Sequence, residues 1–160
     1  MGYHQLDKLD KKILELVTQN ARISFLEVAR ECNVSGAAIH QRIQRLINMG
    51  IIKGSEFIVD TYKIGYQTCA FIGIVLKDLK FFNEVVADIK KIPEVVECHY
   101  ATGKYAMFVK IYAKDNRHLL QIILEKLTVI EGVLTTETFQ LSLDEIFKRQ
   151  VSVFDVITTD

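Results

Sequence analysis

Apolar residues recur at helical spacing through the first fifty residues, separated by short polar segments. A first helix is predicted over about residues 7–18, where Asp7 caps a run of apolar positions: Leu9, Ile13, Leu16 and Val17. A second, shorter helix is predicted over about residues 25–31. Its expected buried positions are Leu26, Val28 and Ala29.

The third predicted helix is bounded by a start signal and a stop signal. Ser35 is a good N-cap, Gly50 ends the helix, and Asn33 suits the turn before it. Val34 and Ile39 can form a hydrophobic staple around the cap. The expected buried face consists of Ile39, Ile43, Leu46 and Ile47. Three helices in this order predict a helix-turn-helix bundle.

The period of the pattern changes after Gly50. Residues 51–59 suggest short extended segments around a Lys-Gly-Ser turn, interpreted as a small wing or a linker strand. The polar segment DTYKIGYQ at 60–67 follows and is the candidate domain boundary. We therefore expect a helix-turn-helix domain with linker over residues 1–60 and a second domain over residues 61–160.

The second domain shows a strand and helix order that nearly repeats itself. Strands are predicted at 68–77, 94–103, 105–114 and 132–143, and helices at 79–92 and 116–130. Two such βαβ units in tandem predict a ferredoxin-like βαββαβ sandwich with an antiparallel sheet and both helices on one face. The whole chain is thus expected to be α+β, with an N-terminal winged helix-turn-helix.

Two of these strands are apolar at nearly every position. Residues 70–76 and 105–112 predict a sheet that needs cover on both faces, and the helices cover only one. A second subunit is the simplest cover, so dimerisation through this domain is a hypothesis. A last apolar segment at 149–158 predicts an extra edge strand that could cross to a partner.

Composition narrows the function classes. The 160 residues are 49% hydrophobic and 25% charged, with a formal net charge of zero, so any affinity for nucleic acid must come from a local patch. Three separated cysteines and the lack of a long apolar run or signal-peptide core favour the cytoplasm and no membrane association. The four histidines lie in different predicted elements, and Cys98 and His99 point to opposite faces of one strand. No metal, cofactor or enzymatic activity is therefore expected.

The third predicted helix carries the local patch. Residues 35–54 contain Arg42, Arg45 and Lys53 and no carboxylate. Arg42 flanks the core face and is expected to reach a phosphate or a neighbouring carboxylate. The bland alternative is a solvated surface helix, but the cap, the turn and the missing acids favour double-stranded DNA in the major groove. The predicted DNA-binding residues are Ser35, Ala37, His40, Gln41, Arg42, Gln44, Arg45 and Lys53. Few of them read bases strongly, which suggests a loose sequence preference with a share of shape readout.

The turn ATGKYA at 101–106 is a second candidate site. Gly103 is most simply a hairpin residue, yet backbone amides at a tight turn can bind a carboxylate, and Lys104 adds a charge. The hydroxyl-rich TTET at 135–138 is a weak signal, because β-propensity explains threonines there equally well.

Taken in order, these segments resemble the Lrp/AsnC family, the leucine-responsive and asparagine-synthesis (feast/famine) transcription regulators. The resemblance covers nearly the whole chain. It rests on LDKLDKKILELVTQNARIS at 6–24, VSGAAIHQRIQRLINMGIIKG at 34–54, IGY at 64–66, IPEVVECHYATGKY at 92–105 and EGVLTTETF at 131–139.

The resemblance implies a DNA-binding domain joined to a domain named for regulation of amino-acid metabolism. Such proteins form dimers that assemble into octamers or larger rings, and amino acids commonly bind between dimers. The effector-binding residues it implies are Thr102, Gly103, Lys104, Tyr105, Ala106, Thr136, Thr138 and Gln140.

The turn departs from the family pattern. Family members often carry Gly-Asp-Tyr-Asp there, whereas this chain has Gly103, Lys104, Tyr105 and Ala106. The acid that would receive an effector's ammonium is missing, and Lys104 could instead favour a carboxylate or another anion. A regulator that assembles without any effector is the alternative.

Two rivals to a DNA-binding regulator follow from the same residues. A metabolite-sensing subunit could dock on an enzyme through its helical domain without binding DNA. A small ferredoxin-fold hydrolase is the enzyme rival, and it lacks a converging nucleophile or acid-base pair.

Overall fold

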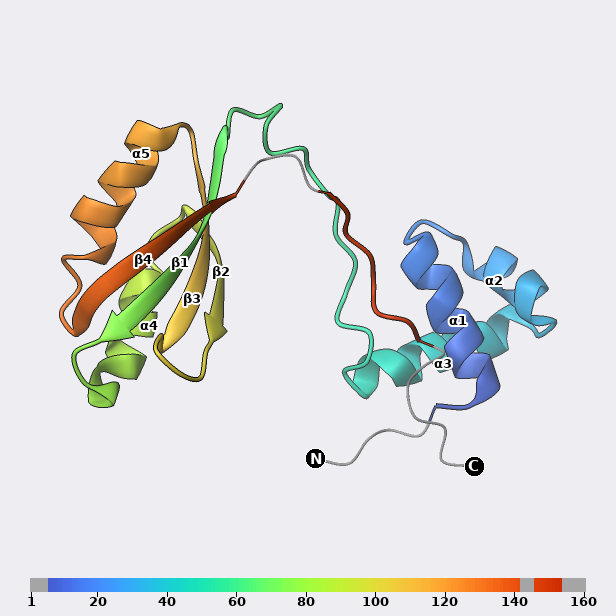
Figure 1. The fold of residues 1–160 in the computed structure, drawn as a ribbon. Helices are drawn as coiled ribbons and strands as arrows, with labels where there is room; N and C mark the ends of the chain where they lie inside the picture. The colour runs from blue at the N-terminus through green and yellow to red at the C-terminus, as the bar shows by residue number, and fades with distance from the viewer. Residues whose placement is uncertain (1–5, 142–145, 154–160) are drawn as a thin grey trace. The chain divides into compact units, whose positions relative to one another are not determined.

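The computed structural model describes residues 6–141 and 146–153, which form two compact units (Figure 1). The helical unit contains the described residues up to Ile58 together with those from Phe147 onward. The sheet unit spans Val59–Ile146. Residues 147–153 therefore belong with the helices, whereas the division made from the sequence grouped them with the C-terminal domain.

Three capped helices build the helical unit: α1 (Lys8–Gln19), α2 (Phe25–Cys32) and α3 (Gly36–Asn48). Asp7 and Ser24 each form a capping box, which satisfies backbone N–H groups at the helix starts. Asn33 ends α2 in the left-handed conformation, with φ at 54°, as expected of the turn residue. The predicted helices are thus confirmed to within two residues.

The core of the helical unit is narrower than the sequence pattern suggested. Ile13, Ile39 and Leu46 are completely buried, but Ile47 is 44% exposed and Leu26 is 60% exposed. The prediction that Ile47 and Leu26 are buried was wrong. At about 100° per residue, Ile47 lies roughly 80° around α3 from Ile39, beyond the stripe that two short neighbouring helices can cover.

The wing expected at residues 51–59 has no strands in the structure. Residues 52–60 form no strand pairing, and Phe57 and Ile58 remain 78% and 88% exposed. Their apolar pattern favours extended backbone, yet no neighbouring strand in the described part of the chain supplies a ladder. The Arg22 guanidinium lies 4.8 Å from the centre of the Phe57 ring.

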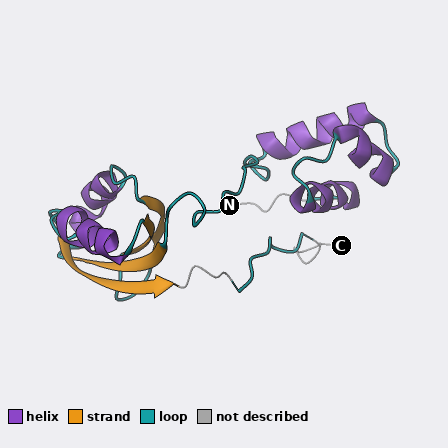
Figure 2. Ribbon diagram, turned by 90° about the horizontal axis from the view of Figure 1, so that it is seen from above, coloured by secondary structure: helices purple, strands orange, loops and turns teal. Residues whose placement is uncertain are grey.

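The sheet unit has the predicted ferredoxin-like order. The four antiparallel strands are β1 (Thr68–Leu76), β2 (Val95–Tyr100), β3 (Met107–Ala113) and β4 (Val133–Leu141), arranged β2-β3-β1-β4. The first crossover is the 3-10 turn η1 (Leu79–Phe81) followed by α4 (Phe82–Ile89), and the second is α5 (Asn116–Gln121) continued by the π-helical η2 (Ile122–Leu127). Figure 2 shows these helices on one side of the sheet.

The helices bury one face of the sheet. Ile72 and Ile74 of β1 and Val109 of β3 are fully buried in one cluster with residues such as Val85 and Ile122 from the helices. Along β3, buried residues alternate with half-buried ones. The second set of side chains therefore projects from the opposite face, which is called the open face below.

The C-terminal tail is extended where the structure describes it. No strand is assigned over residues 146–153, so the predicted edge strand is wrong for 149–153, and residues 154–158 lie outside the described residues. Val153 instead packs against the core of the helical unit, which satisfies its apolar surface without strand pairing. Over the described residues, no helix is long and apolar enough to cross a membrane.

Candidate nucleic-acid interface and ligand site

The start of α3 is built as the sequence predicts. The Ser35 hydroxyl accepts a hydrogen bond from the backbone N–H of Ala38 at 3.2 Å, and Gly36 begins the helix directly after the cap. Ile39, Ile43 and Leu46 of the helix then face inward. Its outer face is exposed and carries Ala37, His40, Gln41, Gln44, Arg45 and Asn48.

The outer face of α3 offers amides and small groups. The Gln44 side-chain amide donates to Asn48 Oδ1 at 3.2 Å, and the His40 ring lies 6.0 Å from the Phe25 ring. Lys53 is exposed but lies after the helix, in the extended segment. The outer face of α3 thus carries hydrogen-bond donors and acceptors of the kind that can bond to base edges.

Two acidic residues at the start of α1, its N-cap Asp7 and Asp10, hold the arginines of α3. Arg42 donates to Asp7 and, at 3.0 Å, to Asp10 Oδ1, whereas Arg45 lies 3.4 Å from Asp10 Oδ2. The Asp10 side chain is completely buried, while the Arg45 side chain is 45% exposed. Arg42 therefore meets the neighbouring carboxylate that the sequence offered as one of its two partners, and Arg45 keeps part of its guanidinium available to solvent.

These contacts shift the pKa values of the residues that form them. Burial raises the pKa of Asp7, but the hydrogen bonds from the Asp10 N–H and from Arg42 outweigh it and leave this pKa below its usual value. The hydrogen bonds to Asp7 and Asp10 raise the pKa of Arg42. The local positive charge of α3 is therefore smaller than its own sequence suggests.

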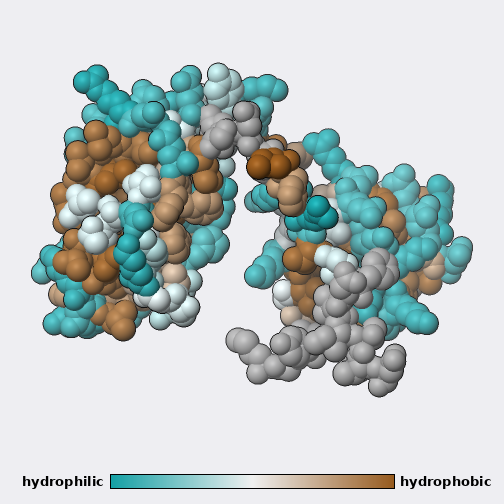
Figure 3. All heavy atoms as spheres, in the orientation of Figure 1, coloured by the Kyte–Doolittle hydropathy of each residue, from teal (hydrophilic) through white to brown (hydrophobic). Residues whose placement is uncertain are grey.

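The open face of the sheet carries an aromatic layer. Tyr105 and Phe108 have ring centroids 5.0 Å apart, and Phe139 lies 6.4 Å from Tyr105 and 6.3 Å from Phe108. Lys110 lies 5.8 Å from the centre of the Phe71 ring and forms an ion pair with Glu97 at 3.4 Å. Figure 3 shows hydrophobic residues gathered over the strands on this face. A surface of this kind is typical of an interface.

The turn before β3 bends onto the open face. The Ala106 N–H donates to Ile74 O at 2.9 Å, which attaches the turn to the end of β1. A Cβ atom added at Gly73 would lie 2.6 Å from the Tyr105 ring, so the absence of a side chain at Gly73 lets this ring lie directly on β1. The turn is thereby held over the central strand.

An ion pair joins the turn to β4. Lys104 Nζ donates to Glu137 Oε2 at 2.6 Å, and the Tyr105 hydroxyl donates to the same oxygen. The hydrogen bond from Lys104 and the smaller effect of the one from Tyr105 lower the pKa of Glu137. The hydrogen bond to Glu137 raises the pKa of Lys104. Both side chains stay accessible, at 67% exposure for Lys104 and 45% for Glu137.

The other expected effector residues do not gather at this pair. Thr136 and Thr138 are paired in register with Ile74 and Ile72, whose side chains belong to the helix-covered face, so both threonines project away from the open face. The Gln140 side-chain amide donates to Asn116 Oδ1 at 2.8 Å. Thr102 and Gly103 lie exposed in the turn itself.

The sequence analysis missed Glu137 and Gly73. Glu137 is the single acid in TTET, and Lys104 stands where the family pattern has an acid. The replacement of that acid by a lysine was the signal in the sequence that an acid elsewhere in the chain could pair with Lys104. The role of Gly73 gives no local signal, because it depends on a ring from another part of the chain.

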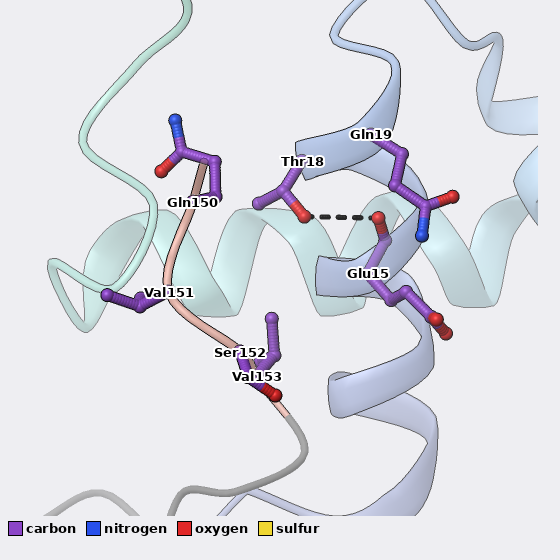
Figure 4. A pocket seen from close by; sticks show the side chains of 7 residues that line it. All are labelled: Glu15, Thr18, Gln19, Gln150, Val151, Ser152 and Val153. Carbon is purple, nitrogen blue, oxygen red and sulfur yellow. Dashed lines mark hydrogen bonds between the residues drawn. The ribbon is translucent and has the colours of Figure 1, made fainter. Parts of the chain in front are cut away.

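The helical unit has a pocket of its own, of about 330 Å³ (Figure 4). It lies between α1 and the C-terminal tail and is lined by Glu15, Thr18, Gln19, Gln150, Val151, Ser152 and Val153. The Thr18 hydroxyl donates to Leu14 O at 2.7 Å and to Glu15 O at 3.1 Å, so this hydroxyl is already satisfied within α1. Across residues 6–141 and 146–153, no three His, Cys, Asp or Glu side chains are grouped to hold a metal ion.

Two family models match the chain. The model for winged helix-turn-helix DNA-binding matches residues 6–53, and the model for the Lrp/AsnC ligand binding domain matches residues 69–151. Together they cover both units.

Individual proteins match at similar coverage. The regulatory protein AsnC of Haemophilus influenzae is 38% identical over 135 residues, which are 84% of this chain and 90% of that protein. AsnC of Escherichia coli is 34% identical over 138 residues, or 86% of this chain and 91% of the relative. A solved structure of E. coli AsnC superposes with a TM-score of 0.86 at 32% identity, over 93% of this chain and 99% of that one.

Proposed function

Because the chain belongs to the Lrp/AsnC family of DNA-binding transcription regulators, we propose that it is a sequence-preferring regulator whose assembly or DNA binding responds to an amino acid. The family consists of regulators and not of enzymes. A cytoplasmic location belongs to this proposal, because the chromosome of a bacterial or archaeal cell lies there.

The exposed outer face of α3 supports the DNA-reading part of the proposal. Gln41 and Gln44 can each make paired hydrogen bonds to a base edge, and the solvent-accessible part of Arg45 can bind a guanine or a phosphate. Arg42 is tied to Asp7 and Asp10 and acts as a positioning residue. Because each helix has so few side chains that can contact bases, several copies of the protein on one DNA molecule would supply the affinity that one copy lacks.

The DNA-reading role is tested on a fragment recovered from cells by crosslinking and sequencing. Arg45→Ala is expected to weaken binding about fivefold to tenfold in gel shifts and to lower the salt dependence by about one phosphate contact. The matched control is Lys63→Ala, which removes an exposed cation of the sheet unit, 80% exposed. Equal affinity for the Arg45→Ala variant and the unmodified protein would remove α3 from the interface.

The aromatic open face supports a homodimer as the basic unit of assembly. Phe71, Tyr105, Phe108 and Phe139 form one side of a contact that a second copy can complete by a two-fold axis. We propose that such dimers assemble further, to octamers. Sedimentation velocity at micromolar concentration tests this step, and a stable monomer would contradict it.

The ion pair between Lys104 and Glu137 supports an amino-acid effector. A zwitterion has one group for each partner, because its carboxylate can bind Lys104 and its ammonium can bind Glu137. Glu137 thus offers the carboxylate that the turn itself lacks. A protein of the same fold, a transcriptional regulator from Neisseria meningitidis, has been solved in complex with L-Met (TM-score 0.83, 24% identity, 91% of this chain and 94% of that one).

Isothermal titration with the twenty amino acids tests the effector. We expect at least one to bind, and both Lys104→Met and Glu137→Gln to weaken it, because each variant removes one of the two charges. Lys63→Met serves as the control for a lysine outside the site. Silence across all twenty amino acids would favour a regulator that works through assembly alone.

A further inference from the structure

The chain passes between its two units twice. It leaves the helical unit after Ile58, through the linker, and it returns to that unit at Phe147, after β4. The C-terminal tail is therefore a second connection between the unit that carries α3 and the unit that carries the open face. A unit held by two connections has fewer positions open to it than a unit held by one.

The tail is held on the helical unit by one apolar side chain. Val153 is half-buried and packs against the core that contains Ile13 and Leu46. Beside Val153, the pocket of about 330 Å³ stays open between the tail and α1 (Figure 4). Within the described part of the chain, none of the α1 residues that line this pocket forms a hydrogen bond with the tail. The contact is therefore narrow, apolar and incompletely packed.

The other apolar side chains of the tail stay in water. Ile146, Phe147 and Val151 are 96%, 70% and 84% exposed, and Figure 4 shows Val151 pointing away from α1. Burial of part of one valine offsets only a small share of the conformational entropy that the ordered residues of the tail lose. The contact between Val153 and the helical unit therefore opens and closes readily.

We propose that the tail is a releasable strap: docking of Val153 restricts the helical unit, and release leaves the linker as its only restraint. The strap itself does not depend on the proposed function, but its consequence rests on DNA binding by a dimer. Two helical units must then be placed on one DNA, and a restricted unit loses less freedom on binding. Docked tails therefore favour binding to paired half-sites, and released tails weaken it.

Trypsin tests the strap without DNA, because its cleavage sites in the tail, Lys148 and Arg149, directly precede the docked residues. A protease needs extended chain on both sides of the bond that it cuts, so the cleavage rate follows the released population. Loss of the C-terminal peptide from the 160-residue chain is followed by mass spectrometry. Val153→Asp puts a charge against the apolar core and is expected to raise the rate about tenfold.

Two variants control this result. Val151→Asp makes the same change at an exposed side chain of the tail and is expected to keep the rate within about twofold. Thr18→Leu acts from α1: it fills part of the pocket with apolar groups and is expected to slow cleavage about threefold. Because it leaves the tail unchanged, it tests the strap even if Val153→Asp does not fold. Equal rates for the two aspartate variants, or no slowing by Thr18→Leu, would overturn the proposal.

Gel shifts then test the consequence for DNA. On a fragment with two half-sites, Val153→Asp is expected to bind about threefold to tenfold more weakly than Val151→Asp, whereas on one half-site the two variants bind alike. Equal affinity on the paired half-sites, together with faster cleavage, would overturn the role of the strap in DNA binding. If the unmodified protein bound no DNA at all, the proposed function would fail, and the cleavage rates would still decide whether the strap exists.

Discussion

The two units of this protein cover their apolar residues in different ways. The helical unit encloses its core with its own three helices and tail and leaves the polar outer face of α3 exposed. The sheet unit encloses only one face with helices and leaves the aromatic layer of Phe71, Tyr105, Phe108 and Phe139 on the other. Under the proposed function, this contrast places DNA contact on a unit that encloses its own core and assembly on a unit that leaves one face uncovered.

The largest expected effect tests whether the helical unit is self-sufficient. Leu46 is fully buried in its core, so Leu46→Ala is expected to cost about 2–5 kcal/mol of unfolding free energy. The control is Ile47→Ala on the same helix, at a side chain 44% exposed, with an expected cost below about 1 kcal/mol.

Two signals from one urea titration compare the units in these variants. Far-UV circular dichroism follows all helices, whereas tyrosine emission follows chiefly the sheet unit, because five of the six tyrosines lie between Tyr62 and Tyr112. We expect Leu46→Ala to move part of the dichroism transition to lower urea and to leave the tyrosine transition in place. If both transitions move together, the two units do not fold independently.

The second prediction concerns a substitution that disrupts the aromatic layer of the open face. Phe108 contacts Tyr105 and Phe139 at the centre of the aromatic layer, so Phe108→Asp would bury an unpaired charge in any dimer formed there. The dimer is expected to weaken by about 3 kcal/mol, on the order of a hundredfold, when measured by analytical ultracentrifugation.

Leu79→Asp is the matched control for the open face. Leu79 is 71% exposed in η1, outside the aromatic layer, and its replacement is expected to leave the dimer intact. Equal dissociation by both variants would mean that exposed apolar surface in general, and not the open face, drives assembly.

The third prediction concerns the charges of the recognition helix. Asp7→Asn removes one of the two carboxylates that hold Arg42, yet asparagine caps a helix as well as aspartate does. With one negative charge fewer beside α3, affinity for DNA is expected to rise about twofold to fivefold, most clearly at low salt. Asp60→Asn, which loses a 3.4 Å pair with Lys63 in the sheet unit, is the control in the same gel shifts. A fall in affinity would show that Asp7 presents Arg42 to DNA and does not restrain it.

Local signals in the sequence predicted the elements well. The caps at Asp7 and Ser35, the turn at Asn33 and the strand order β2-β3-β1-β4 follow from neighbours in the chain or from a known supersecondary pattern. The strand segments expected at 51–59 were not predicted correctly, because an extended segment becomes a strand only beside a partner. The local sequence pattern therefore predicts the backbone conformation that a segment prefers, but not whether the segment pairs with another strand.

The contacts that shape the candidate sites were beyond local reasoning. Asp10 and Arg42 are 32 residues apart, and Lys104 and Glu137 are 33 residues apart. A charge in a sequence can pair with any of many opposite charges, and only the packing of α1 on α3 or of the turn on β1 selects the partner. The sequence therefore identified charged residues of the candidate sites, but not which of them form ion pairs with one another.

The smallest expected effect compares the accessible pair in the sheet unit with a protein that lacks it. The pKa of Glu137 is lowered by Lys104 and Tyr105, so the pair stabilises the fold above the unfolded glutamate pKa of about 4.3. This contribution is lost as the pH falls through the lower, folded-state pKa, whereas the raised pKa of Lys104 keeps that group charged throughout. The melting temperature of Lys104→Met should therefore lie below that of the unmodified protein at pH 6, by only about one or two degrees because both side chains are exposed. By pH 3 this difference in melting temperature should shrink, since protonation of Glu137 removes from the unmodified protein the ion pair that the substitution has already removed.

A difference that persists unchanged at pH 3 would assign the stabilisation to the packing of the Lys104 stem over the Tyr105 ring, which lies 4.9 Å from its ammonium. In that case the side chains of the turn are held on the open face by packing and not by the ion pair with Glu137, and the contrast with the helical unit, where ion pairs join α3 to the start of α1, becomes sharper.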